Sequence, residues 1–276
     1  MSLIVNQSNL MNKVDKYVAN KTLSRFVILT GKPLSGKTYL SEIIAKRISK
    51  SIAKIEYNVD SIRSMIETAY KVSEPITYII DNADNMSNSA KNALLKITEE
   101  PPRKAYFLLV ITDLNKIPAT LRSRGNILKL SDYSKEDIKN YINQLDYYDN
   151  SDISMLMDIC ESPAEVNYFL NHNLKDFHKL VSTIVFDLKK VTGVKSFRLV
   201  QKVKIKKEDE SGFDLKFIMN KVNYLTYNSI INENIDIERG YNILLKTSER
   251  ISDLNTTGIN QLSLFDKWIL DLRSIK

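Results

Sequence analysis

The chain has 276 residues, of which 43% are hydrophobic and 26% charged, as is ordinary for a globular protein with a sizeable core. Its formal net charge of +7 favours an anionic partner, of which nucleic acid is the usual kind. A single cysteine, Cys160, excludes an internal disulfide and a four-cysteine zinc site. No apolar run is long enough to cross a bilayer, and residues 1–7 lack the basic and apolar regions of a signal peptide, so we expect a cytoplasmic protein.

The first predicted elements surround a phosphate-binding pattern. Apolar residues at helical spacing predict a helix over residues 10–19, and an apolar run predicts a strand over 26–29. The residues Gly31-Lys32-Pro33-Leu34-Ser35-Gly36-Lys37-Thr38 then fit the P-loop pattern G-x-x-x-x-G-K-[ST], and a helix is predicted from Leu40 to Ile48. Strand, loop and helix in this order are the context that a P-loop requires. The alternative is a glycine turn that only joins a strand to a helix.

A P-loop predicts an ATP and Mg²⁺ site. The backbone N–H groups and the helix N-terminus of such a loop hold phosphates, Lys37 reaches the β- and γ-phosphates, and the Thr38 hydroxyl binds Mg²⁺. The nucleotide-binding candidates in this segment are Gly31, Ser35, Gly36, Lys37, Thr38 and Tyr39.

An alternating pattern predicts the next strand, over residues 53–59, and a following helix that carries Ile62, Met65, Ile66 and Ala69. Asp60 is the candidate N-cap of that helix. Strands that alternate with helices in this way predict an α/β fold whose parallel sheet is covered on both faces.

The stretch from Ile76 to Arg124 carries the remaining chemistry. A buried strand over residues 76–80 delivers Asp81 to the sheet edge, where it can hold the Mg²⁺ or a water of the Mg²⁺ shell. A helix over residues 90–97 is ended by Pro101-Pro102, and a strand over 106–111 follows.

Four motifs in this stretch resemble a known family. They are Asp81-Asn82-Ala83-Asp84, Ser89-Ala90-Lys91-Asn92-Ala93-Leu94-Leu95-Lys96, Glu99-Glu100-Pro101-Pro102 and Leu121-Arg122-Ser123-Arg124. Together they are similar to the AAA+ subunits of DNA polymerase sliding-clamp loaders, above all the delta-prime and gamma/tau subunits of bacterial DNA polymerase III and the small subunits of phage loaders. The resemblance is strong over the first half of the chain. It implies DNA replication as the process and, as partners, other subunits of a hetero-oligomeric ring, a sliding clamp and primer-template DNA.

The resemblance also implies roles for three residues. Thr112 matches the sensor-1 position, where a polar side chain helps to place the attacking water. Arg124 matches the arginine finger that a subunit inserts into its neighbour's nucleotide site, where a guanidinium stabilises phosphate charge. Arg63 lies on a helix that faces DNA in the family. The alternatives are a surface arginine at the end of a helix for Arg124 and a surface salt bridge for Arg63.

Two departures from the family pattern bear on hydrolysis. Asn82 replaces the glutamate that polarises the attacking water, and an amide cannot take a proton. Asp84 lies past the strand end, so we do not expect it to replace the missing glutamate as the base. Residues 162–165 lack the sensor-2 arginine. The intact P-loop favours a working ATPase subunit, whereas these two departures favour a delta-prime-like structural subunit; a stand-alone P-loop ATPase outside replication is the third hypothesis.

The rest of the chain is predicted to be helical. By resemblance we divide the protein into an AAA+ core (1–131), a helical lid (132–176) and a helical collar that holds subunits together (177–276). Ser134 with Asp137 predicts a capping box, and Cys160 is expected to be buried. Further helices are predicted by apolar residues over 154–159, 164–170, 180–188, 213–225 and 259–272. The basic stretch 202–207 is compatible with DNA contact or with a solvated helix face.

Overall fold

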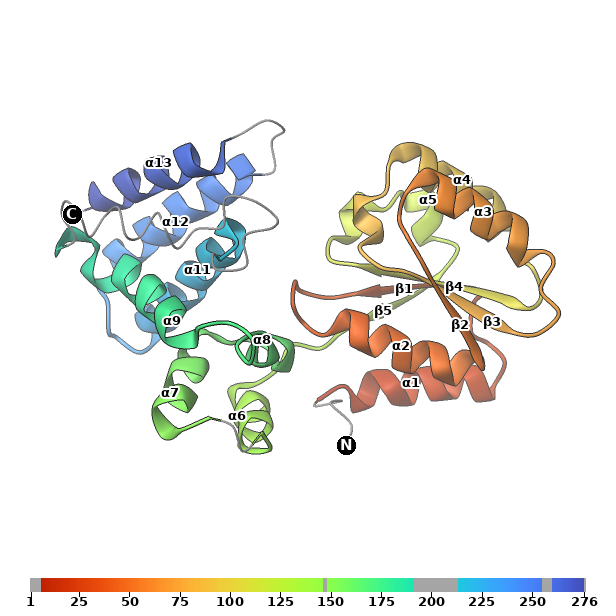
Figure 1. The fold of residues 1–276 in the computed structure, drawn as a ribbon, viewed down its shortest axis with the longest axis horizontal. Coiled ribbons are helices and arrows are strands. Elements are labelled where there is room, and N and C mark those ends of the chain that lie inside the picture. The colour runs from red at the N-terminus through yellow and green to blue at the C-terminus, as the bar shows by residue number, and fades with distance from the viewer. Residues whose placement is uncertain (1–5, 146–147, 191–212, 255–259, 276) are drawn as a thin grey trace. The chain divides into compact units, whose positions relative to one another are not determined.

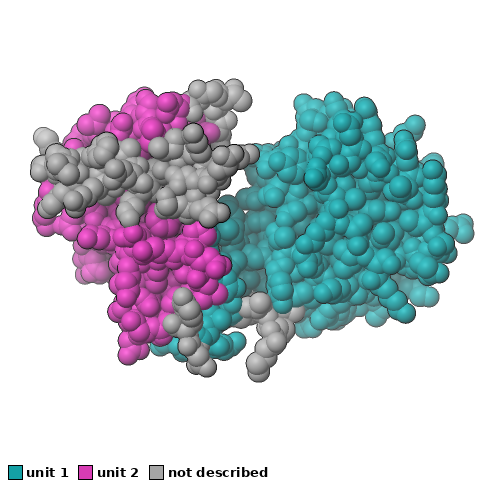
Figure 2. Space-filling model, in the orientation of Figure 1, with its two compact units in different colours: residues 1–146, 161–168 teal, residues 147–160, 169–276 magenta. Residues whose placement is uncertain are grey.

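The computed structural model describes residues 6–145, 148–190, 213–254 and 260–275. The chain divides into two compact units, residues 1–146 with 161–168, and residues 147–160 with 169–276 (Figure 2). The charged stretch 202–210 lies outside the described residues. None of the described helices combines the length and the apolarity that crossing a bilayer requires.

The first unit is built around a five-stranded parallel sheet, labelled in Figure 1. The strands lie in the order β2-β3-β4-β1-β5. Their bounds are β1 Phe26–Thr30, β2 Ser51–Ile55, β3 Ile76–Ile80, β4 Ala105–Ile111 and β5 Asn126–Lys129. All pairs are parallel, so the carboxyl ends of the strands, from which the loops with the predicted site residues leave, lie at one edge.

Helices cover both faces of this sheet. The helices of this unit are α1 Ser8–Ala19, α2 Lys37–Ile48, α3 Val59–Ala69, α4 Asn88–Glu99, α5 Ala119–Arg122, α6 Lys135–Asn143 and α8 Pro163–Tyr168, of which α1 to α5 pack against the sheet. Alternate strand residues face opposite layers: Phe26 and Ile28 pack in the cluster that includes α3 and α4, whereas Val27 and Leu29 pack in the cluster that includes α1 and α2. The α/β fold with a covered parallel sheet is therefore confirmed.

Some predicted elements are confirmed and others are wrong. The strand 76–80 and the Ser134–Asp137 capping box are as predicted. The strand predicted over 53–59 is β2, Ser51–Ile55, because Val59 already begins α3. The N-cap of α3 is Asn58 rather than Asp60: the Asn58 Oδ1 accepts a 2.8 Å hydrogen bond from the Ser61 N–H.

The second unit is helical in its described residues. Its helices are α7 Asn150–Ile159, α9 Leu174–Ser182, α11 Leu215–Ile231, α12 Ile237–Leu254 and α13 Gln261–Arg273. The helix predicted over 180–188 is not a single α-helix. The α-helical part, α9, ends at Ser182 and is followed by a π-helical turn, Thr183–Asp187, and a 3₁₀ turn, Leu188–Lys190. Cys160 is buried, as predicted.

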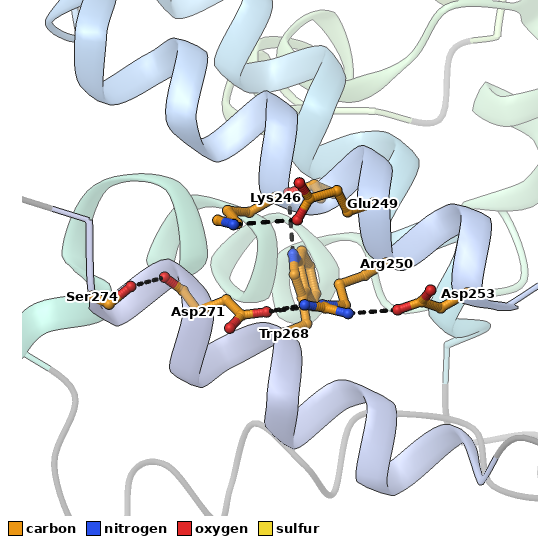
Figure 3. A network of polar contacts seen from close by, with 8 residues as sticks. Lys246, Glu249, Arg250, Asp253, Trp268, Asp271 and Ser274 are labelled. Atoms are coloured by element: carbon orange, nitrogen blue, oxygen red, sulfur yellow. Dashed lines mark hydrogen bonds and ion pairs between the residues drawn. The ribbon is translucent and has the colours of Figure 1, made fainter.

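Helices α12 and α13 are joined by a polar network (Figure 3). The buried Trp268 donates a 3.1 Å hydrogen bond from Nε1 to the Thr247 hydroxyl. Arg250, on α12, donates to Asp271 of α13 at 2.8 Å and to Asp253 of its own helix at 2.5 Å. The bond from Arg250 to Asp271 joins the two helices with a directional contact that apolar packing alone does not provide, and Asp253 holds the guanidinium from its own helix.

Candidate functional site

The P-loop lies between β1 and α2, at the carboxyl edge of the sheet. Gly36 is the N-cap of α2 and has φ +83, a left-handed conformation that glycine adopts without steric cost. At Gly31, an added Cβ would come within 3.1 Å of both the Ser35 Oγ and the Leu130 Cβ, so only glycine fits there without a shift. The loop is thereby folded tightly enough to present its backbone N–H groups to a phosphate.

Lys37 is the first residue of α2 and is nearly buried, with 9% of its surface exposed. Its Nζ donates a hydrogen bond to the Lys32 carbonyl, which also accepts a 3.3 Å bond from the Ser35 N–H. Burial lowers the pKa of Lys37, and the nearby Asp81 and Asp84 carboxylates partly oppose this shift. The lysine is therefore folded over its own loop, next to two acids.

Thr38 and Asp81 are in direct contact across the sheet edge. The Thr38 hydroxyl donates a 2.7 Å hydrogen bond to Asp81 Oδ2. Asp81 directly follows β3, and its other oxygen, Oδ1, accepts a 2.8 Å bond from the Asn82 N–H. The sequence predicted both side chains as Mg²⁺ candidates, and the fold brings them together from positions 43 residues apart.

Asn82 and Asp84 lie in the turn after β3. Asn82 is exposed and has φ +52, a left-handed conformation that asparagine tolerates better than most residues. The turn brings Asp84 back under the sheet edge, where it is 8% exposed. Its Oδ2 accepts 3.2 Å hydrogen bonds from the N–H groups of Thr112 and Asp113, which follow β4.

Asp84 is a residue of this site whose role sequence reasoning missed. Its carboxylate ties the end of β3 to the predicted sensor-1 position, Thr112, whose own side chain is exposed. The sequence offered one signal for this role, namely a second acid, three residues after Asp81 and just beyond the end of the strand.

Helix α8 reaches the P-loop within the same unit. The Ser162 hydroxyl donates a 2.5 Å hydrogen bond to the Leu34 carbonyl, and a Cβ built on Gly36 would lie 4.0 Å from the Ala164 Cβ. Tyr133 donates a 3.2 Å bond to the Ser35 carbonyl. The residues 162–165 therefore do lie beside the loop, and none of them is an arginine.

Arg124 lies outside this cluster, between α5 and β5. Its side chain is 31% exposed and pairs with Glu99 at 2.7 Å. The next residue, Gly125, packs closely on β1: an added Cβ would come within 2.7 Å of the Phe26 ring and 2.8 Å of its carbonyl oxygen. Arg63 is exposed on α3, and Tyr39 is 43% exposed in the first turn of α2.

The donor set fits a nucleotide with Mg²⁺. The Ser35 hydroxyl is buried in the loop and has no hydrogen-bond partner among the described residues, so a polar group of the loop is left for a ligand. Thr38 and Asp81 supply the hard oxygen ligands that Mg²⁺ prefers. No group of three or more His, Cys, Asp or Glu side chains in the described ranges could hold a metal by itself. Mg²⁺ at this site would therefore depend on phosphate and water oxygens as well.

Comparison with known proteins finds a family and several relatives that match part of the chain. Residues 49–134 match the family described as DNA polymerase III, delta subunit. The chain is 40% identical over 90 residues to the DNA polymerase III subunit gamma of Buchnera aphidicola subsp. Schizaphis graminum, a match that covers 32% of this chain and 25% of that protein. It is 32% identical over 127 residues to the subunit delta' of the same organism, covering 45% and 39% respectively.

Two further matches extend these findings. The replication factor C small subunit of Sulfolobus acidocaldarius is 26% identical over 156 residues, covering 51% of this chain and 48% of that protein. Among solved structures, a DNA polymerase III gamma subunit-related protein of Thermotoga maritima has a TM-score of 0.58 at 16% identity, covering 96% of this chain and 99% of the other. The chain spans about a quarter to about a half of the length of these sequence relatives, and the solved structure bears on the fold alone. These matches therefore support a resemblance to subunits of DNA polymerase III and replication factor C over part of the chain, and the solved structure supports an α/β fold with a helical C-terminal region.

Proposed function

We propose that this chain is an ATP-binding subunit of a replication clamp loader, acting in a hetero-oligomeric ring that opens a sliding clamp and loads it on primer-template DNA. The observation that carries the nucleotide site is the 2.7 Å hydrogen bond from Thr38 to Asp81, which joins the P-loop to the acidic end of β3. The clamp, the DNA and the neighbouring subunits follow from the relatives named above rather than from this chain's geometry.

Each residue has a distinct task in this proposal. Bound Mg²⁺·ATP would supply the phosphoryl group that is transferred to water. The Lys37 amine would leave the Lys32 carbonyl and bind phosphate oxygens instead. Thr38 and Asp81 would hold the Mg²⁺ that accompanies the nucleotide. Asp84 fixes the backbone at Thr112, whose hydroxyl is available to orient water.

A delta-prime-like structural role is the second candidate, and two observations favour it. The residue after Asp81 is an amide rather than a carboxylate, and the start of α8, beside the P-loop, brings Ser162 and Ala164 instead of an arginine. Loss of a general base of this kind costs ~10²–10⁴-fold in rate. We therefore propose that this subunit binds ATP but hydrolyses it slowly, and that it offers Arg124 to a neighbour's site.

Single-turnover ATP hydrolysis tests the proposal, measured with the chain alone and with its co-expressed partners, clamp and primed DNA. Loss of DNA-stimulated hydrolysis in Lys37→Ala would assign this subunit's own site to the motor. Unchanged hydrolysis in Lys37→Ala together with its loss in Arg124→Ala would assign the structural role. If neither variant changes DNA-stimulated hydrolysis and no clamp-loader partner copurifies, the proposal is wrong. The remaining hypothesis is then a stand-alone P-loop ATPase outside replication.

The variant Asn82→Glu tests the origin of slow hydrolysis. Restoring the carboxylate should raise the single-turnover rate if the missing base limits it. Because position 82 is left-handed, glutamate there carries a conformational cost of ~1 kcal/mol. Asn82→Gln, which has similar size and backbone preference but no base, is the matched control; equal rates in the two variants would contradict this explanation.

A further inference from the structure

The Glu-Glu-Pro-Pro motif places a carboxylate beside the candidate arginine finger. Glu99 is the last residue of α4, and Pro101 prevents the helix from continuing. From this position the Glu99 Oε1 accepts a 2.7 Å charge-assisted hydrogen bond from Arg124 Nη2. The motif therefore ends α4 at the position from which the Glu99 carboxylate reaches the Arg124 guanidinium.

Arg124 is also held by other groups of its own unit. Its Nη1 donates to the Thr120 carbonyl of α5. Its backbone N–H donates to the Leu121 carbonyl at 3.2 Å, and its own carbonyl accepts a 3.1 Å bond from the Ser24 hydroxyl. The backbone is thus fixed on both sides, and only the side chain is free to change its partner.

The ion pair opposes the action of Arg124 on a phosphate. A guanidinium joined to a carboxylate is neutral as a pair, so it offers less positive charge to a neighbour's nucleotide than a free guanidinium would. The Glu99 carboxylate would also repel the phosphate anion. Arg124 Nη2 must therefore exchange Glu99 for phosphate oxygens when it acts in a neighbouring site.

We propose that Glu99 is a positioning residue that holds Arg124 against its own subunit until the phosphates of a neighbour's nucleotide replace its carboxylate. This inference rests on the proposed finger role of Arg124. Glu99 is 55% exposed, and ion pairs of such exposure are weak, so the contact restrains the arginine reversibly. Its effect is to reduce the fraction of subunits whose finger is available.

The test is nucleotide hydrolysis in the complex assembled with co-expressed neighbours, comparing Glu99→Gln with the matched control Glu100→Gln. Glu100 is the adjacent exposed acid, and the acid that pairs with the Arg124 guanidinium is Glu99. Glu99→Gln should lower the nucleotide concentration for half-maximal hydrolysis by ~2–5-fold, and Glu100→Gln should leave it unchanged. Rising salt should shrink the difference between wild type and Glu99→Gln, because ions already screen the exposed pair.

A double variant separates failure of this inference from failure of the finger role. If Arg124→Ala reduces hydrolysis to a measurable residual rate and adding Glu99→Gln to it changes neither that rate nor the half-maximal nucleotide concentration, Glu99 acts through Arg124. If Arg124→Ala abolishes hydrolysis but Glu99→Gln matches Glu100→Gln or is less active, the restraining role is wrong and the finger role stands. If Arg124→Ala has no effect, both are wrong. Each variant is first checked for nucleotide binding at its own P-loop, which should be retained.

Discussion

The Thr38 hydroxyl and the Asp81 carboxylate, which come from the P-loop helix and from the end of β3, are joined by a 2.7 Å hydrogen bond. From this contact we predict that Thr38 and Asp81 are responsible for the Mg²⁺ dependence of ATP binding. Asp81→Asn should weaken Mg²⁺·ATP binding ~10–100-fold while changing metal-free ATP binding far less, because the amide no longer attracts the cation. Thr38→Ser, which keeps the hydroxyl, is the control. Equal losses with and without Mg²⁺, measured by calorimetry, would contradict the assignment.

The lowered pKa of Lys37 predicts an alkaline limit to ATP binding. Burial disfavours the charged amine, so the folded-state pKa lies below 10.5, and the protonated form that pairs with phosphate is lost as the pH rises through that lower value. Affinity should begin to fall at a pH below the ordinary lysine value in the wild type but persist at that pH in Lys37→Arg, whose side chain stays charged. Lys32→Ala, which keeps the carbonyl that Lys37 contacts, should follow the wild-type profile. If ATP affinity depends on pH in the same way in the wild type and in Lys37→Arg, deprotonation of Lys37 does not cause the alkaline loss of binding.

Asp84 is predicted to stabilise the edge that joins β3 and β4. Its substitution by alanine leaves two N–H groups, of Thr112 and Asp113, without their acceptor, and should lower the free energy of unfolding by ~1–3 kcal/mol. Asp113→Asn keeps the backbone N–H and should have little effect. Urea unfolding measures both variants. A stable Asp84→Ala protein would show that water replaces the carboxylate at no cost.

Arg250 is predicted to stabilise the second unit through α12 and α13 (Figure 3). Its side chain is 14% exposed and bonds to Asp253 and Asp271, so Arg250→Ala removes both ion pairs, including the one that links α12 to α13, and should cost ~1–3 kcal/mol. The matched control on the same helix is Lys246→Ala, which removes an exposed pair with Glu249 and should cost about 0.5 kcal/mol or less. Similar thermal midpoints for the two variants would contradict the structural role of Arg250.

Local patterns predicted most of the first unit. The strand β3 and the helix after the P-loop follow from strong apolar periodicity bounded by polar or proline residues. The strand β5 was missed, because four residues at a sheet edge, with Ile127 exposed and Leu128 buried, leave too short a pattern to detect. The N-cap of α3 was misplaced because Asn58 and Asp60 are both good capping residues, and only the packing of the helix selects between them.

The second unit was harder to predict because its apolar residues do not all lie on buried faces. Helix α12 carries Ile237 and Tyr241 at 71% and 62% exposure, while Ile243 and Thr247 are buried, so its apolar positions do not coincide with its buried positions. In the candidate site, the sequence identified Thr38 and Asp81 but not the contacts made by Asp84 or Glu99. Both depend on long-range geometry, since the partners are 28 and 25 residues away.

The division of the chain has a consequence for any attempt to separate its halves. Residues 161–168 belong to the first unit, whereas 147–160 belong to the second, so the chain passes between the units three times. A fragment that stops at 146 loses the Ser162 hydroxyl that holds the P-loop carbonyl of Leu34. A fragment that runs on to 168 keeps that bond but carries α7 with its buried residues Leu156 and Ile159 stripped of α9 and α11. No single end point in the chain therefore keeps both the Ser162–Leu34 hydrogen bond and a fully packed α7 in a fragment of the first unit.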